Sequence, residues 1–359
     1  MSFVNDNSEI NDIRTQVEFK GITFSNFKKT EVKTQLIENI KNAKLEPASY
    51  WCAELVCAGH YMDVWEIILH YVGKHIHLGN PKLVIYLERR YTIFKNIINQ
   101  GYHLNELQLR NFENIRKLFA EIICVLSKSH KKHSFEHIKI NRIEEFDITQ
   151  MTERLKAPSI SFIEQIYKPK DPKEFIIPMN EFAYNLSPEC RNVTTSCYWI
   201  EWMIDFDILC KKRREPCYCE KRNEYNVDNK MKCDIIWMVW DCIFYYCDLL
   251  DNQYITTIMR SLLELFCIKY TSATSKKRRY LLYFAVALII EPVPTTIEIV
   301  NDKNTIQYVV ENINSIYKQI KVNEKSPKTE YLFSNLDKDN NFEKTIEKLE
   351  MMNKIENYL

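Results

Sequence analysis

The sequence predicts an all-α protein whose two similar multi-helix halves pack as helical hairpins or as a solenoid-like array. Three observations support this fold class. Apolar residues recur at steps of three and four along most of the chain, as on one face of a helix. Only five glycines occur in 359 residues, and none follows Gly101, so turns that need a positive φ are expected to be scarce. Aromatic landmarks of the first half also return in the same order in the second.

The first half is predicted over 24–144, behind a flexible polar arm at 1–23. Pro47 suits the first turn of a helix, where its missing N–H leaves no hydrogen bond unmade. Gly79, followed closely by Pro81, is typical of a helix end. We therefore expect helices from about residue 29, from 47, from 62 to the stop at 79, over 82–99 and over 106–126.

A linker is predicted over 145–180, where four prolines interrupt a stretch without periodicity. The second half follows over 181–295, and a C-terminal helix with a charged tail occupies 296–359. The shared landmarks suggest a degenerate internal duplication, although a chain rich in aromatic residues can produce such echoes by chance. The echoed segments are Tyr50-Trp51 with Tyr198-Trp199, Val64-Trp65 with Val239-Trp240, and Arg89-Arg90-Tyr91 with Arg278-Arg279-Tyr280.

The composition is that of a water-soluble globular protein, with 46% apolar and 27% charged residues and a formal net charge of +1. No apolar run reaches the roughly 18 residues that a membrane span needs, and the N-terminus lacks the basic flank and apolar core of a secretory signal. We therefore expect a protein that is not secreted and has no membrane partner. Most of its twelve cysteines are expected to be small core residues in a reducing compartment.

Motifs of the common enzyme folds are missing from the sequence. It contains no Walker loop, dinucleotide fingerprint or kinase glycine loop, all of which use glycines to bring backbone N–H groups to a phosphate. The G-x-S-x-G and H-E-x-x-H patterns are missing as well. We expect no enzymatic activity and no cofactor other than a zinc ion.

The zinc hypothesis concerns an insertion at 210–233. Its four cysteines, Cys210, Cys217, Cys219 and Cys233, follow the pattern C-x6-C-x-C-x13-C. Zinc needs four thiolate or imidazole ligands in a tetrahedron, and cysteine ligands usually come in pairs with two to four residues between them. Cys217 and Cys219 are one residue too close for such a pair. Two interpretations remain open: a four-cysteine zinc site, or a polar connector between two helices flanked by buried thiols.

Clusters of basic residues are the candidates for binding nucleic acid or a partner protein. Cations that neutralise phosphates add salt-sensitive affinity for nucleic acid. Cations also gather at helix ends simply because they complement the helix dipole, so a solvated face is the alternative. The candidates are Arg89, Arg90, Lys211, Lys212, Arg213, Arg214, Lys276, Lys277, Arg278 and Arg279, provided that the arginines are not consumed by internal ion pairs.

Other side chains that could carry chemistry have simpler structural interpretations. His70 and His77 are two helical turns apart and could share a face, but a capping or partly exposed role is expected. The six tryptophans lie at helical spacing among aliphatic residues, so they are expected in cores and not stacked on bases. The carboxylates of the chain that lie near these aromatic residues are expected to form buried ion pairs with Arg89, Arg90, Arg278 or Arg279. These carboxylates are Glu54, Glu66, Glu201, Asp205 and Asp241.

Three stretches carry a family resemblance: PASYWCAELVCAGHYMDVWEIIL at 47–69, HLGNPKLVIYLERRYTIFKNII at 77–98 and KKRRYLLYFAVALI at 276–289. At these stretches the chain resembles a family of uncharacterised proteins of nucleocytoplasmic large DNA viruses, the giant viruses. The similarity covers most of 25–295. It implies a place in the host cell cytoplasm or viral factory, in the nucleus or in the virion, and it carries over no functional residue.

The sequence as a whole favours a non-enzymatic helical scaffold or adaptor in a viral replication, transcription or assembly complex. Its expected partners are other proteins, viral ones in particular. One alternative is a nucleic-acid-associated factor with a four-cysteine zinc site and basic clusters that face phosphate. Another is a structural component of the virion.

Overall fold

Helices account for all the regular secondary structure in the part of the chain described by this computed structural model, which comprises residues 7–100, 106–142, 146, 152–300, 302–325 and 346–350. Within these ranges the nearest approach to a sheet is one isolated bridge between Ile22 and Lys28. The predicted all-α class is therefore confirmed. The main helices are α1 (Lys29–Lys41), α2 (Leu45–Cys57), α3 (Tyr61–Tyr71), α4 (Leu83–Gln100), α5 (Glu113–Lys128), α7 (Ile176–Leu186), α8 (Val193–Lys212), α9 (Ile236–Leu249), α10 (Gln253–Cys267), α11 (Thr274–Lys277), α12 (Arg279–Ile290) and α13 (Lys303–Lys321).

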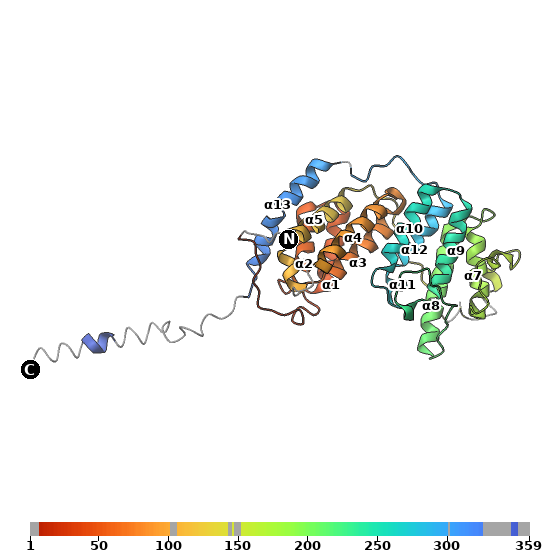
Figure 1. The fold of residues 1–359 in the computed structure, drawn as a ribbon, viewed down its shortest axis with the longest axis horizontal. Coiled ribbons are helices and arrows are strands. Elements are labelled where there is room, and N and C mark those ends of the chain that lie inside the picture. The colour runs from red at the N-terminus through yellow and green to blue at the C-terminus, as the bar shows by residue number, and fades with distance from the viewer. Residues whose placement is uncertain are drawn as a thin grey trace, which may run out of the picture.

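The first half comprises α1 to α5, shown in red to yellow in Figure 1. Helix α1 packs against α2, and α2 packs against α5. Trp65 of α3 is fully buried, with Tyr91 edge-on to it at 5.1 Å between ring centroids and Phe119 at 6.1 Å. Such aromatic pairs add stability beyond the area that they bury. The expected core role of Trp65 is confirmed.

The predicted boundaries in the first half are close to the observed ones, with one correction. Helix α2 begins two residues before Pro47, which lies in its first turn as expected. The helix predicted over 106–126 is instead a 3₁₀ turn, η3 (Glu106–Asn111), followed by α5. The two are separate because Phe112 between them has an extended backbone, with φ of −81° and ψ of 120°.

The second half comprises α7 to α12, shown in green to cyan in Figure 1. Helices α7 and α12 both pack against α8, and α12 also contacts α9 and α10. Trp199 and Trp240 are fully buried, and the Trp240 ring lies 5.3 Å from that of Phe266. Helix α7 starts inside the region predicted as linker, and the residues before it form the short turns η5 (Ser161–Ile163) and η6 (Lys173–Phe175).

Helix α13 crosses back to the first half, where it packs against α5 and α2 (Figure 1). Its inward face carries Ile313, Ile316, Tyr317 and Ile320, all buried. The first half therefore includes a helix from the far end of the chain. The segment at 291–300, here called the strap, connects α12 of the second half to α13.

The two halves meet where α4 packs against α10 and where α12 packs against the π-helix η1 (Val72–Ile76), the 3₁₀ turn η2 (His77–Gly79) and α3. Gly73 of η1 allows the contact of η1 with α12. A Cβ atom at this position would lie 2.9 Å from the carbonyl carbon of Tyr280, closer than real Cβ contacts come. Residue 73 must therefore be glycine for the two elements to pack in this way.

Positive φ angles occur despite the scarcity of glycine, which corrects the expectation that turns of this kind are scarce. Four of them fall on the residue after a helix C-cap: Ala43, Arg214, Asp251 and Lys269. A left-handed residue there lets the backbone N–H groups that follow cap the last turn of the helix, a position that glycine usually takes. In this chain other residues adopt that conformation.

Among the described helices, none combines the length and the apolar character that a membrane crossing requires.

Candidate functional site

The helices α8 and α11, 62 or more positions apart in the sequence, meet at Asp205 of α8. Lys276 of α11 lies 3.7 Å from the Asp205 carboxylate, and Arg142 donates a hydrogen bond to the same carboxylate at 2.9 Å. Asp205 is thus the acidic residue that draws cations from two other segments to α8. We name the α8–α11 basic surface after these two helices. It consists of the exposed residues Lys212, Arg213 and Arg214 at the end of α8 and of Lys276 and Lys277 in α11, which contacts α8 about two turns before that end.

Lys211, which sequence analysis grouped with this cluster, has a different role. Its ammonium group is 2.6 Å from Asp207 and 3.3 Å from Asp234, so it links α8 to the residues that precede α9. The hydroxyl of Tyr270 donates to Asp234 at 2.9 Å. Although burial tends to lower the pKa of Lys211, its two carboxylate partners raise it above the usual value. Lys211 is therefore a cross-link under the surface and not a free cation.

The chain reverses direction sharply at the end of α8. Arg214 has a φ of 64°, and the N–H of Glu215 donates to the Cys210 carbonyl at 3.0 Å. The thiol of Cys217 then lies beside that of Cys210, with burial raising the pKa of Cys217 to about 12. The loop therefore folds back along the last turn of α8. The next residue, Tyr218, points outward with 59% of its surface exposed.

Arg278 and Arg279 are not part of the exposed surface, which corrects their assignment as binding residues. Arg278 is 3% exposed, and its guanidinium donates to Glu66 of α3 and to the carbonyls of Phe266 and Ile268. Arg279 is similarly buried, with an ion pair to Glu201 at 2.8 Å. Both arginines pair with groups inside the protein, because α12 is buried and the residues at its start are buried with it. Glu66 and Glu201 thus confirm the expected internal pairing of these carboxylates.

Arg89 and Arg90 occupy α4, in the first half, apart from the α8–α11 basic surface. Arg89 is exposed. Arg90 forms an ion pair with Glu121 of α5 and lies 5.1 Å from the ring centroid of Tyr86. The ten basic residues singled out in the sequence therefore do not form one site.

The four cysteines of the zinc hypothesis are not gathered around one point. The Cys219 thiol donates to the Asp234 carbonyl at 3.2 Å, and its backbone N–H donates to the Cys233 carbonyl at 3.0 Å. Cys210 and Cys217 lie together at the end of α8. Across the described ranges, no three or more His, Cys, Asp or Glu side chains are arranged to hold a metal ion. The thiol geometry thus favours the second interpretation, a connector between helices.

The insertion is held in place by Arg222, which sequence analysis did not single out. This arginine is fully buried, as is the Asp171 side chain that receives two of its hydrogen bonds, at 2.5 and 2.7 Å. Its Nε donates to Asp241 of α9 at 2.8 Å, and Tyr225 donates to that same carboxylate at 2.6 Å. Burial alone would lower the pKa of Arg222, but the two carboxylates raise it. One residue therefore joins the insertion, the linker and α9.

The histidines lie at the junction of the halves and hold a neighbouring segment in place. His75 shares a hydrogen bond of 2.7 Å with the Ser134 hydroxyl, and Nε2 of His77 donates to the His133 carbonyl at 2.7 Å. The His70 ring meets the Tyr280 ring edge-on at 5.2 Å. Because η1 is a π-helix, the two-turn spacing that would place His70 and His77 on one face is broken. Burial lowers the pKa of both His70 and His75 to about 4.

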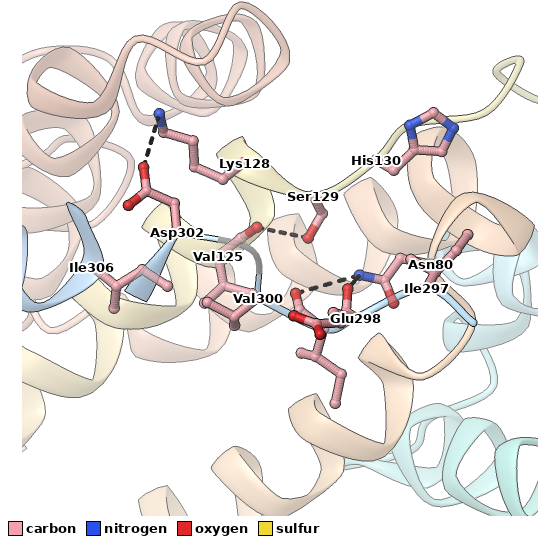
Figure 2. Close-up of a pocket in the computed structure, with 11 residues that line it drawn as sticks. Asn80, Val125, Lys128, Ser129, His130, Ile297, Glu298, Val300, Asp302 and Ile306 are labelled. Carbon is pink, nitrogen blue, oxygen red and sulfur yellow. Dashed lines mark hydrogen bonds and ion pairs between the residues drawn. The ribbon is translucent and has the colours of Figure 1, made fainter. Parts of the chain in front are cut away.

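A cavity of about 20 Å³ lies under the strap, next to Asn80 (Figure 2). The Asn80 amide donates to the carbonyls of Glu298 and Ile299 at 3.3 and 3.4 Å. Its buried Oδ1 has no hydrogen-bond partner among the described atoms. The space suits a single water molecule. Lys128 and Asp302, 3.7 Å apart, border the same cavity, and their ion pair holds the start of α13 beside the end of α5.

A larger cleft of about 380 Å³ lies between α4 and α10. Tyr91 and Ile98 line it from the first half, and Leu265 and Cys267 from the second. The exposed Lys95 is at its rim. Because both halves line this cleft, any molecule that binds there contacts both of them.

Glu201 and Arg222, two buried polar groups with shifted pKa values, form structural ion pairs. The exposed features are a basic surface at one helix end and apolar side chains elsewhere. Comparison of the chain with models of protein families, with curated proteins and with solved structures found no match.

Proposed function

We propose that the protein is a non-enzymatic adaptor that binds two different protein partners, one on each half, in a viral replication, transcription or assembly complex. The resemblance to a family of giant-virus proteins supports the viral setting. Exposed apolar side chains on both halves support the adaptor role. Apolar side chains that gather on a surface mark sites of protein interaction, whereas isolated ones are ordinary.

The arm patch is the apolar surface of the first half, formed by Ile13, Val17 and Val322. Val17 is 79% exposed and Val322 is 84% exposed. Backbone contacts join these two parts of the chain, because the Ile13 N–H donates to the Lys325 carbonyl at 3.2 Å. The N-terminal arm and the end of α13 are thus joined, and both carry exposed apolar side chains.

The α7 patch is the apolar surface of the second half, formed by Ile160 and Ile177, which are 58% and 46% exposed. Helix α7 packs against η5, and the Asn180 amide donates to the Ser159 carbonyl at 2.8 Å. The two isoleucines therefore belong to the same pair of packed elements. Helix α7 lies at the opposite end of the molecule from α13 and the N-terminal arm (Figure 1).

The junction between the halves sets the relative position of the two patches. The contacts of α4 with α10 and of η1 with α12 join the halves directly. The strap adds a third connection, since Lys82 of the first half donates to the Thr295 carbonyl at 2.6 Å. A partner on the arm patch and a partner on the α7 patch would therefore be held at a defined separation.

Affinity capture with mass spectrometry, from the cells in which the protein is made, tests this proposal. One variant carries Val17→Asp and Val322→Asp, and a second carries Ile160→Asp and Ile177→Asp. Leu249→Asp, at an exposed position outside both patches, is the control. We expect each patch variant to lose a partner that the other variant and the control retain, with unchanged thermal unfolding. Capture of the same proteins by both patch variants and the parent would refute the adaptor role.

A further inference from the structure

We propose that the α8–α11 basic surface binds single-stranded nucleic acid, with its cations on phosphates and Tyr218 stacked on a base. This inference goes beyond the adaptor function. It uses no residue of the arm patch or the α7 patch, so either proposal can fail while the other stands.

The cations of this surface come from separate segments, and the helix dipole explains only some of them. Lys212 and the residues that follow it sit at the carboxyl end of α8, where cations are favoured without any ligand. Lys276 and Lys277 come from α11, and Lys276 contacts Asp205 on the same helix α8, about two turns before Lys212. Arg142 arrives from a segment that is not helical. The dipole of α8 therefore accounts for Lys212 and its neighbours, but not for the cations that α11 and the segment of Arg142 place alongside the same helix.

Two of the acidic residues nearby bind the inner cations and leave the outer ones available, and a third, Glu215, is exposed directly after Arg214. Asp205 pairs with Arg142, and Asp207 pairs with Lys211. Within the described part of the chain, no carboxylate forms an ion pair with Lys212, Arg213, Arg214 or Lys277, and all four are exposed. Four outward cations suit the closely spaced phosphates of a nucleic acid strand.

Tyr218 adds an exposed aromatic ring to this charge. It lies four residues after Arg214, in the loop that Glu215 and Cys217 fold back against the last turn of α8. Proteins that bind single strands combine a positive surface with aromatic side chains on which bases stack. Bases in a duplex are already stacked on each other, and an acidic protein segment offers no base to stack. The ring therefore favours a single strand over both of these.

Fluorescence anisotropy of a labelled oligothymidylate about 15 nucleotides long, with the purified full-length protein, tests the proposal. We expect binding that weakens steeply between about 50 mM and about 200 mM salt. The variant with Arg213→Glu, Arg214→Glu and Lys277→Glu should lose about tenfold or more in affinity and show a shallower salt dependence. The matched control is Lys20→Glu with Lys41→Glu, two exposed lysines of the first half, and it should bind like the parent.

Two further variants separate this mode of binding from simpler ones. Tyr218→Ala should lower the affinity about fivefold, at high and low salt alike, because stacking does not depend on salt. Arg214→Gly removes one charge at a position with a φ of 64°, which glycine adopts readily, so it should weaken binding without lowering the melting temperature.

Three outcomes would overturn the proposal. The first is a parent protein that does not bind the oligothymidylate at the lower salt concentration. The second is an equal loss in the control variant, which indicates unspecific attraction. The third is competition by polyglutamate as strong as by the unlabelled oligothymidylate, together with no effect of Tyr218→Ala, which would identify the surface as a docking site for an acidic protein segment.

Discussion

Arg116 in the first half and Arg222 in the second are both fully buried, yet their charges are stabilised in different ways. All five N–H donors of Arg116 meet oxygen atoms of uncharged groups, with Arg110, Ser8, Asn111 and Asn314 supplying the acceptors. Its guanidinium also lies 4.0 Å from the ring centroid of Tyr317.

Arg222 instead lies between two carboxylates, those of Asp171 and Asp241. Burial lowers the pKa of Arg116, whereas the carboxylates raise that of Arg222. The contrast shows two ways to fasten distant segments with one residue type. Arg116 joins the N-terminal arm and α13 to α5 through neutral hydrogen bonds, and Arg222 joins the insertion and the linker to α9 through ion pairs.

Removing the ion-paired Arg222 should have the largest effect on the free energy of unfolding. Arg222→Met leaves the Asp171 carboxylate buried without its counter-ion, so we expect the free energy of unfolding to fall by about 3–5 kcal/mol in urea denaturation. Lys221→Met, at the adjacent exposed position, is the control and should change it little. Adding Asp171→Asn to the Arg222→Met variant should restore part of the loss, since the fully buried carboxylate is then gone and only the partly exposed Asp241 has lost its partner. A loss below about 1 kcal/mol for Arg222→Met would contradict this account.

The second half should also respond to pH through Glu201, the partner of Arg279. Burial raises the pKa of Glu201 from 4.5 to about 7, against the opposing effect of Arg279. Between these values the folded protein holds one more proton than the unfolded chain, so stability declines as the pH rises. At about 1.4 kcal/mol per pH unit, the decline is on the order of 3 kcal/mol. Glu201→Gln should remove it when urea denaturation is compared at about pH 5 and about pH 8. Parallel profiles of stability against pH for Glu201→Gln and the parent would contradict this prediction.

Removing Arg116, the arginine with uncharged partners, should lower the stability less. Arg116→Met orphans uncharged oxygen atoms only, so we expect a loss of about 2 kcal/mol. Hydrogen exchange should also quicken in the arm near Ser8 and in α13, the two segments that this arginine fastens. Lys117→Met, on the same helix but partly exposed, is the control. A loss larger than that of Arg222→Met would reverse the comparison.

The junction between the halves should lose stability on acidification. Burial lowers the pKa of His75 from 6.5 to about 4, so the folded protein binds fewer protons than the unfolded chain between these values. Stability should therefore fall as the pH drops from about 6.5 to about 4, the opposite sense to Glu201. His75→Gln should reduce this acid sensitivity in thermal unfolding followed by circular dichroism. An unchanged pH profile would show that His75 does not titrate in this way.

Features set by local periodicity could be predicted from the sequence, and features set by long-range contacts could not. Apolar spacing predicted the helices and the burial of Trp65 and Trp240, because one buried face leaves a repeat of three to four residues. The return of α13 to the first half leaves no local pattern. The role of Arg222 depends on Asp171, 51 residues away, and nothing in the insertion itself distinguishes this arginine from its exposed neighbours.

The candidate basic surface was predicted in part for the same reason. The runs at 211–214 and 276–279 could be recognised as charged, but only the fold shows that Lys276 and Lys277 lie outside while Arg278 and Arg279 turn into the core. The cysteines of the insertion suggested a metal because their spacing is close to that of a zinc knuckle. In the structure their backbone and thiol contacts are those of a folded loop.

The central claim is that the two halves form one unit that holds the arm patch and the α7 patch at a defined separation. Pulsed electron–electron resonance tests it most directly, with spin labels on non-natural amino acids at the exposed positions Lys20 and Lys173, so that the twelve cysteines stay intact. We expect a single narrow distribution of distances. A broad distribution, or two separate maxima, would mean that the halves move independently and would contradict the account.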